Sequence, residues 1–420
     1  METLDLRKPG FRADPSPELS RVREAGPLCR IEPFGFLGVT RFGDVLQVLK
    51  NPKLYSSAGL EAYFPAIPGA ELFSVGRTLI GMDPPDHARV RRLIQRAFTI
   101  QEMAAWEPRI EGLTRGLIDK VLTGGPAFDL IADLATPLPV RVIAAMLGVD
   151  PERGPDFKRW SDDMVSVRSV QIATDSEWRR RREREIAQSC TEFTEYFEQV
   201  IAARRREPQD DLISAIVRAA DEGQIITPAE ILSLTRLMLV AGNETTTNLL
   251  GSALMALLRR PEQWRALTQN PELAANAVEE ALRFDGPVLM LTRRVTQDTE
   301  IGGVRVAADT VVMPMLASAN RDPRQFADPD RFDIRRDASG HIAFGLGVHL
   351  CVGAPLARIE TRIALAHLAA RCPDLALADT PPVWLDSLIL RGLKALPLTR
   401  TVHVPEPMAA RPAGASVATL

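Results

Sequence analysis

The sequence predicts a mainly α-helical protein with a small β portion, organised as one domain. The 420 residues are 45 % apolar, which is enough for one large packed core. Helical patterns dominate the middle of the chain, and the strand-like segments are short. Because no internal repeat or interdomain linker interrupts the chain, residues 1–402 are interpreted as a single domain. Residues 403–420, rich in Pro and Ala, are expected to form a disordered tail.

The longest predicted helix begins at a capping box, Thr227-Pro228-Ala229-Glu230, and continues to Arg260, where Pro261 stops it. At ~1.5 Å per residue it would be roughly 50 Å long and would cross the whole domain. A second helix is expected over residues 270–286, and a third over residues 354–370. The clearest strand-like segments are residues 300–306 and 310–313.

Composition excludes several classes of protein. The formal net charge is −3, so nothing suggests binding to nucleic acid or to an anionic membrane. The four cysteines show no paired spacing, which argues against a disulfide framework or a zinc site and favours a reducing compartment. Residues 1–20 contain no apolar core of a signal peptide, and no apolar run is long enough to span a bilayer. We therefore expect a cytoplasmic protein with no membrane contact.

The strongest local signal is the sequence FGLGVHLCVG, residues 344–353. Its glycines specify a tight loop, and the helical pattern that follows places Cys351 just before a helix N-terminus. There the free N–H groups and the helix dipole stabilise a thiolate. The ordinary interpretation of a lone cysteine would be a buried thiol in a glycine-rich turn.

This loop resembles the cysteine-ligand signature of the cytochrome P-450 family at every fixed position: Phe344-Gly345-x-Gly347-x-His349-x-Cys351-x-Gly353. The resemblance implies the fold of that family, with haem b (iron protoporphyrin IX) lying between the long helix and the helix after the loop. It implies that Cys351 is the thiolate ligand of the iron, where it pushes electron density onto the metal and favours O–O cleavage.

The similarity extends from about residue 84 to residue 398. Glu280-Ala281-Leu282-Arg283 resembles the family's Glu-x-x-Arg helix, and ANRDP (319–323) and PDRFD (329–333) follow it in the family's order. The resemblance implies that Arg331 joins Glu280 and Arg283 in a buried ion network that holds the cysteine loop in place.

Residues 241–247, AGNETTT, lie inside the long helix. A threonine hydroxyl can bond back to the i−4 carbonyl, so Thr245 is expected to bond to Ala241 and open a notch. The alternative is a polar patch packed against a loop. The stretch is similar to the family's oxygen-binding segment, which implies that Ala241 contacts the cofactor and that Glu244 and Thr245 are catalytic residues delivering protons.

The two haem propionates need cations or donors if they are buried. The resemblance assigns this role to His87 and Arg91, one helical turn apart, to Arg293, and to His349 of the cysteine loop. The register leaves open whether Arg293 or Arg294 meets the propionate.

The reaction implied by the resemblance is RH + O2 + two electrons + two protons giving ROH + H2O, a hydroxylation or epoxidation. Electrons would come from a separate ferredoxin or flavodoxin with its reductase, entering near a basic stripe of Arg89, Arg92 and Arg96. The apolar loop over residues 57–79, with Val288, Leu289 and Leu390, predicts an apolar small-molecule substrate. Terpenoids, steroids, fatty acids and polyketides all fit.

Two alternatives stay open at this point. One is a haem-thiolate enzyme of another reaction type, such as a peroxide-driven oxygenase or an isomerase. The other is a non-enzymatic haem sensor. Glu244 and Thr245 argue against both, because neither protein needs a proton relay to dioxygen.

Overall fold

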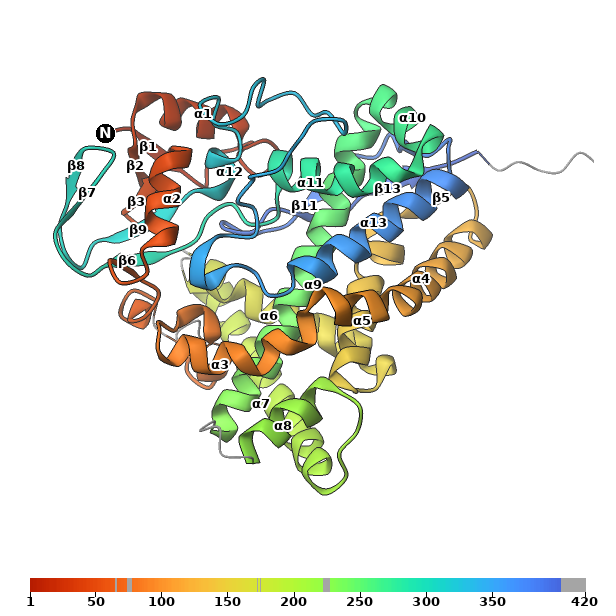
Figure 1. Cartoon of the computed structure of the whole chain (residues 1–420), viewed down its shortest axis with the longest axis horizontal. Coiled ribbons are helices and arrows are strands. Elements are labelled where there is room, and N and C mark those ends of the chain that lie inside the picture. The colour runs from red at the N-terminus through yellow and green to blue at the C-terminus, as the bar shows by residue number, and fades with distance from the viewer. Residues whose placement is uncertain (65, 74–77, 172, 174, 222–226, 402–420) are drawn as a thin grey trace, which may run out of the picture.

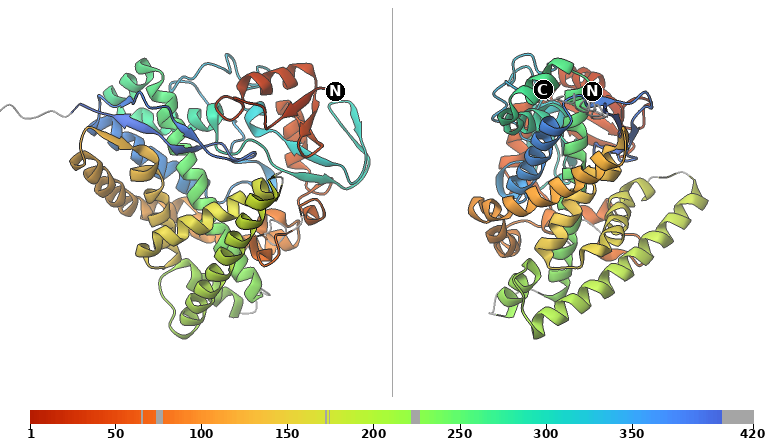
Figure 2. Two further views of the ribbon diagram at one scale, coloured as in Figure 1. Left: turned by 180° about the vertical axis from the view of Figure 1, so that it is seen from behind. Right: turned by 90° about the vertical axis from the view of Figure 1, so that its right-hand side faces the viewer.

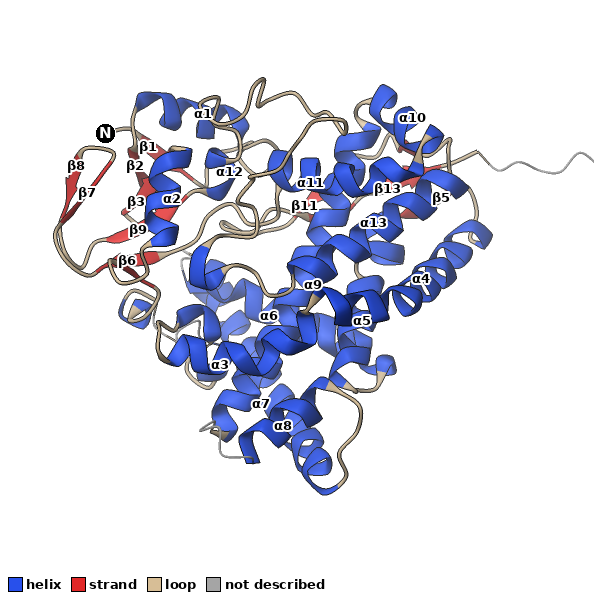
Figure 3. Ribbon diagram, viewed as in Figure 1, coloured by secondary structure: helices blue, strands red, loops and turns tan. Residues whose placement is uncertain are grey.

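The computed structural model describes residues 1–64, 66–73, 78–171, 173, 175–221 and 227–401. The predicted tail therefore lies outside the described residues. Helices make up most of the described chain and strands a small part of it (Figure 3). The prediction of a mainly α-helical protein with a small β portion is confirmed.

The α-helices vary widely in length, from four to 31 residues. In chain order they are α1 (Ser16–Ala25), α2 (Phe42–Lys50), α3 (Asp86–Gln95), α4 (Ile100–Thr123), α5 (Pro137–Leu147), α6 (Gly154–Gln171), α7 (Ser176–Arg206), α8 (Leu212–Asp221), α9 (Pro228–Leu258), α10 (Pro261–Gln269), α11 (Ala274–Asp285), α12 (Leu316–Ala319) and α13 (Ala354–Arg371). α6 and α7 pack side by side at one end of the molecule (Figure 2).

A six-stranded sheet lies on the side of the molecule away from α4 and α5 (Figure 1), and its strand order is β1-β2-β3-β9-β6-β4. These strands are β1 (Thr3–Asp5), β2 (Leu28–Glu32), β3 (Phe36–Val39), β4 (Tyr55–Ser56), β6 (Arg293–Val295) and β9 (Val311–Pro314). The smaller sheets contain β5 (Ala127–Asp129), β7 (Thr299–Ile301), β8 (Val304–Val306), β10 (Ala376–Leu377), β11 (Val383–Trp384), β12 (Leu393–Ala395) and β13 (Pro397–Thr399).

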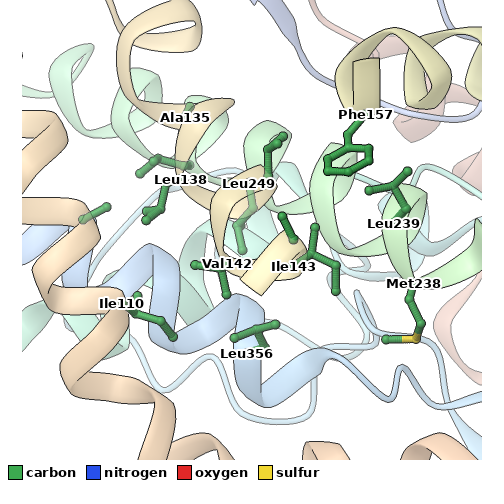
Figure 4. Packing of buried hydrophobic residues seen from close by; sticks show 14 of the residues in the cluster. Ile110, Ala135, Leu138, Val142, Ile143, Phe157, Met238, Leu239, Leu249 and Leu356 are labelled. Atoms are coloured by element: carbon green, nitrogen blue, oxygen red, sulfur yellow. The ribbon is translucent and has the colours of Figure 1, made fainter. Parts of the chain in front are cut away.

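Helix α9 runs through the middle of the molecule (Figure 1). Its first turn has the predicted capping box: the Thr227 side chain accepts from the Glu230 N–H, and the Glu230 carboxylate accepts from the Thr227 N–H. Most of its residues are buried, and it packs against α5, α11 and α13. Figure 4 shows Leu249 of α9 among Val142 and Ile143 of α5 and Leu356 of α13. This core fixes α9 beside the helix that follows the cysteine loop.

Two local predictions need correction. Residues 300–306 form a hairpin of β7 and β8 rather than one strand, because Gly302 and Gly303 both adopt positive φ (57° and 80°) and reverse the chain. The helix expected from residue 270 begins as a 3-10 turn at Pro271–Leu273 and becomes α-helical at Ala274. Within the described residues, no helix is long and apolar enough to cross a membrane.

Candidate active site

The cysteine loop is shaped by two glycines. Gly345 and Gly347 have φ of 70° and 74°, in the left-handed region that favours glycine. A Cβ at Gly347 would lie 2.7 Å from the backbone oxygen of Leu49, so a larger residue would also collide with the end of α2. The chain can therefore fold tightly against α2 before it enters α13.

Cys351 lies three residues before the first residue of α13. Its N–H donates to the Phe344 carbonyl at 3.0 Å, which closes the loop. Surrounding protein raises the pKa of its thiol, while the N–H groups of Gly353 and Ala354 and the charges of Arg91 and Arg358 act in the opposite direction. The residue is nevertheless exposed to solvent, whereas Cys29, Cys190 and Cys372 are buried. Among the four cysteines, only Cys351 combines exposure with donors aimed at its sulfur.

Basic side chains gather beside this loop. The rings of His87 and His349 have centroids 4.3 Å apart, and Arg91 donates to the Leu350 carbonyl at 2.6 Å. Burial and the charges of Arg293, His87 and Arg91 lower the pKa of His349 to about 3. All four predicted cofactor-binding donors are thus brought together next to Cys351.

The structure also separates Arg293 from Arg294. Arg294 forms an ion pair with Asp309 at 2.7 Å on the outer side of β6. Arg293 is buried, and burial lowers the pKa of its guanidinium to about 10, with only the Asp83 charge opposing. Since neighbouring residues of a strand point to opposite faces, only Arg293 faces the basic cluster.

The basic cluster fits a ligand that carries two carboxylates. Among the described residues, neither Arg91 nor Arg293 has a carboxylate within ion-pair distance, and the buried Nε2 of His87 has no hydrogen-bond partner. In the part of the chain that the structure describes, Arg91 and Arg293 keep their positive charges without a paired carboxylate, and for the buried Arg293 this is costly unless an anion joins it. A haem, with two propionates and an iron that takes a thiolate, matches this set of donors and the adjacent cysteine.

On α9, the hydroxyl of Thr245 donates to the Ala241 carbonyl at 2.7 Å, as predicted. Ala241 is exposed and Thr245 is half-buried, although residues 246–257 below them are buried. This face of α9 is therefore accessible at Ala241 and Thr245. α9 remains a continuous helix through this stretch.

Glu244 points away from that surface, toward α6. Its Oε1 lies 3.3 Å from Nζ of Lys158, which also pairs with Asp162. Burial raises the pKa of Glu244 to about 7, and the Lys158 charge partly opposes the shift. The carboxylate can thus exchange a proton near neutral pH, while Lys158 and Asp162 extend from it toward solvent.

The predicted ion network behind the loop is present, with one residue wrong. Arg283 holds Glu280 through two bonds of 2.8 and 2.9 Å, and both side chains are fully buried. Arg331 is not part of this network, since its side chain is 67 % exposed and pairs with Asp333. Arg336 reaches Glu280 instead, at 3.4 Å. The chain turns at residues 328–331, so that the Arg331 carbonyl, not its side chain, faces Arg283.

The expected basic stripe on α3 is smaller than predicted. Arg92 and Arg96 are exposed, but Arg89 forms an ion pair with Glu230 at the start of α9, at 2.6 Å. Helical geometry placed Arg89 on the outer face and could not show that α9 begins beside it.

Several residues of the site were not identified from sequence. Ser57 bonds to His349 at 3.0 Å, and the Asp83 carboxylate accepts from the Ser57 N–H at 2.8 Å. Lys158 lies 86 residues from the carboxylate that it meets. These contacts join distant segments, so no local pattern could have indicated them.

The fold and the basic cluster beside the cysteine loop fit a haem-binding protein, and comparison with known proteins identifies its family. The family model described as Cytochrome P450 matches residues 47–373. The chain is 36% identical to 6-deoxyerythronolide B hydroxylase of Saccharopolyspora erythraea over 94% of this chain and 98% of that protein. The chain belongs to the cytochrome P450 family; it is a haem-dependent monooxygenase.

Two solved structures are also similar. CYP109E1 from Bacillus megaterium in complex with testosterone shares 34% identity, with a TM-score of 0.84 and coverage of 93% of this chain and 99% of that chain. Myxobacterial CYP267B1 in complex with myristic acid shares 38% identity, with a TM-score of 0.86 and coverage of 95% and 99%. The expected P450 fold is confirmed.

Proposed function

We propose that this enzyme inserts one oxygen atom into an apolar small molecule of moderate size, of the steroid, fatty acid or polyketide class. The observation that carries the proposal is the accessible face of α9 at Ala241 and Thr245, where one hydroxyl is held by a bond to the helix backbone. The similar proteins named above act on 6-deoxyerythronolide B or were solved with testosterone or myristic acid. All of these compounds are largely apolar.

In this proposal Cys351 ligates the haem iron. Gly353 and Ala354 donate their N–H groups to the sulfur and favour its ionised form, since α13 directs its positive end there. When bound, haem supplies the redox chemistry that activates dioxygen. His87, Arg91, Arg293 and His349 would hold the two propionates, whose negative charges would pair with the guanidinium groups of Arg91 and Arg293.

Glu244 and Thr245 deliver protons in this proposal. Glu244, with its pKa of about 7, takes protons through Lys158 and Asp162 on the side facing α6. The Thr245 hydroxyl, which donates to Ala241, keeps its lone pairs free to accept a proton donor on the accessible face. Because the Glu244 and Thr245 side chains face different sides of α9, the proposal requires water to carry the proton between them.

Electrons reach the haem from a separate ferredoxin or flavodoxin with its reductase. The exposed residues Arg92 and Arg96 of α3 and the 43%-exposed Leu350 beside Cys351 offer a docking surface with a basic edge. An acidic partner would be steered there by charge complementarity.

The experiment for the substrate is absorbance titration of the ferric holoenzyme with testosterone, myristic acid and 6-deoxyerythronolide B, followed by turnover with a ferredoxin system. We expect at least one compound to shift the haem absorbance and to yield a product one oxygen atom heavier. If all three leave the spectrum unchanged, while small polar compounds shift it, the apolar substrate class is wrong.

A further inference from the structure

Glu279 lies next to Glu280 on α11, but its carboxylate faces a different neighbour. Its Oε1 accepts from Nε of Arg358 at 2.6 Å, and its Oε2 accepts from Nη2 of Arg358 at 3.0 Å. The same Oε2 also accepts from Nε2 of His341 at 3.0 Å. A single carboxylate therefore joins α13, through Arg358, to the segment that leads into the cysteine loop, through His341.

The hydrogen bonds of His341 define its tautomer. Its Nδ1 accepts from the Ala343 N–H at 3.2 Å, so this nitrogen carries no proton. The proton is then on Nε2, which donates to Glu279. Glu279 thus orients the ring, and the ring orients the backbone of Ala343, the residue immediately before the loop.

The Arg358 contact reaches the same part of the loop. The Arg358 guanidinium lies 4.6 Å from the ring centroid of Phe344, the first residue of the loop, in a cation–π contact. The Phe344 carbonyl accepts the Cys351 N–H at 3.0 Å. Both contacts of Glu279 therefore end at residues 343–344, one hydrogen bond from Cys351.

We propose that Glu279 is a positioning residue for the Cys351 thiolate: by holding His341 and Arg358 together, it fixes the Phe344 carbonyl that orients the Cys351 backbone. This inference rests on the proposed role of Cys351 as the iron ligand. Glu279 touches neither the sulfur nor the haem site, so its effect passes through the two side chains that it holds.

The charge state of Glu279 suits this role. Burial raises its pKa, but the hydrogen bonds from His341 and Arg358 outweigh burial and lower the pKa to about 2. The carboxylate is therefore ionised near neutral pH, and its three bonds are charge-assisted.

The chain offers a matched control in Glu107. This residue on α4 pairs with Arg362, one turn further along α13 than Arg358. Glu107→Gln removes one negative charge and one arginine partner on the same helix, as Glu279→Gln does. Among the described residues, the Glu107–Arg362 pair has no contact with the cysteine loop. Comparing the two variants separates loop positioning from the general effects of charge and helix anchoring.

The test uses the haem-loaded parent, Glu279→Gln and Glu107→Gln. Three quantities are measured: the rate at which the reduced carbon monoxide complex loses its thiolate-type spectrum in mild denaturant, the haem reduction potential, and amide exchange over residues 343–351. We expect Glu279→Gln to lose the thiolate spectrum roughly tenfold faster, as the loss of one charge-assisted contact would predict, and to raise the potential. We expect Glu107→Gln to lose the thiolate spectrum at a rate within about twofold of the parent's rate.

If both variants behave alike, or if amide exchange over residues 343–351 is unchanged in Glu279→Gln, Glu279 has no positioning role. Should Glu279→Gln fail to bind haem, Arg358→Lys replaces it, because lysine keeps the charge but loses the bidentate contact. If Arg358→Lys then loses the thiolate spectrum at the parent's rate, the inference is overturned. If Arg358→Lys loses it faster, the inference is supported. A parent whose carbon monoxide complex lacks the thiolate spectrum would instead refute the assignment of Cys351.

Discussion

Nζ of Lys158 on α6 lies 3.3 Å from Oε1 of Glu244 on α9, so two helices are joined at the carboxylate proposed to deliver protons. Burial raises the Glu244 pKa from 4.5 to about 7, and Lys158 limits the rise. The carboxyl group therefore binds a proton more tightly in the folded protein than in the unfolded chain. This difference has a measurable consequence for stability.

Because the folded pKa is raised, the contribution of Glu244 to stability is fully present below about pH 4.5 and is lost as the pH rises through about 7. Glu244→Gln carries no such proton. Its free energy of unfolding, relative to the parent, should therefore increase by on the order of 1–3 kcal/mol between about pH 5 and about pH 8. The measurement is denaturant unfolding of both proteins at several pH values.

Glu192→Gln serves as the control for that series. The hydrogen bond from Arg159 lowers the pKa of Glu192, so its carboxylate is ionised in both folded and unfolded states over the same pH range. The stability difference between the parent and Glu192→Gln should stay constant from about pH 6 to about pH 8. If the stability difference between the parent and Glu244→Gln is also independent of pH, Glu244 does not titrate near neutral pH.

The elements and residues that could be predicted from sequence are those encoded by local patterns. The start of α9 follows from a capping box within four residues, and the cysteine loop follows from its glycines and the helix after it. Arg336 and Lys158 could not be found in this way, because each meets its partner through a fold that joins distant segments. Arg331 was assigned by motif alone, and its side chain turned out to face solvent.

The second prediction concerns the buried network behind the loop. Arg336→Ala removes one partner of the fully buried Glu280 and should destabilise the protein by about 1–3 kcal/mol, less than the about 3–5 kcal/mol of a stranded buried charge, because Arg283 still pairs with Glu280. Arg331→Ala removes an exposed side chain and should change the free energy of unfolding by less than about 0.5 kcal/mol. Denaturant unfolding and haem content are measured together. If Arg331→Ala destabilised the protein more than Arg336→Ala, Arg331 and not Arg336 would be the partner of Glu280.

The third prediction concerns Thr245. Thr245→Ala should keep substrate affinity but divert electrons to peroxide or water, because the proposed hydroxyl relay on α9 is lost. The fraction of NADH consumption that appears as product is measured. Thr235→Ala is the control, since Thr235 makes the same i−4 bond, to Ile231 at 2.9 Å, from a buried position on the same helix. If Thr245→Ala and Thr235→Ala convert the same fraction of consumed NADH into product, Thr245 is not part of the proton relay.

The fourth prediction concerns electron entry. Arg92→Glu should slow reduction by an acidic ferredoxin at low salt while haem content and substrate binding stay unchanged, and the gap should shrink as salt is added. Arg265→Glu, an exposed residue on the distant helix α10, makes the same charge change (Figure 1). The rate is followed by stopped-flow absorbance. A defect that salt does not alter, or one shared by Arg265→Glu, would place the docking surface elsewhere.

The central claim is that Cys351 is the iron ligand, and the spectrum of the reduced carbon monoxide complex tests it most directly. Serine is placed singly at Cys351 and, as controls, at the buried residues Cys29, Cys190 and Cys372. The account predicts that the three controls that fold keep the thiolate-type spectrum and that Cys351→Ser alone loses it, or binds haem weakly. An unchanged spectrum in Cys351→Ser would contradict the account.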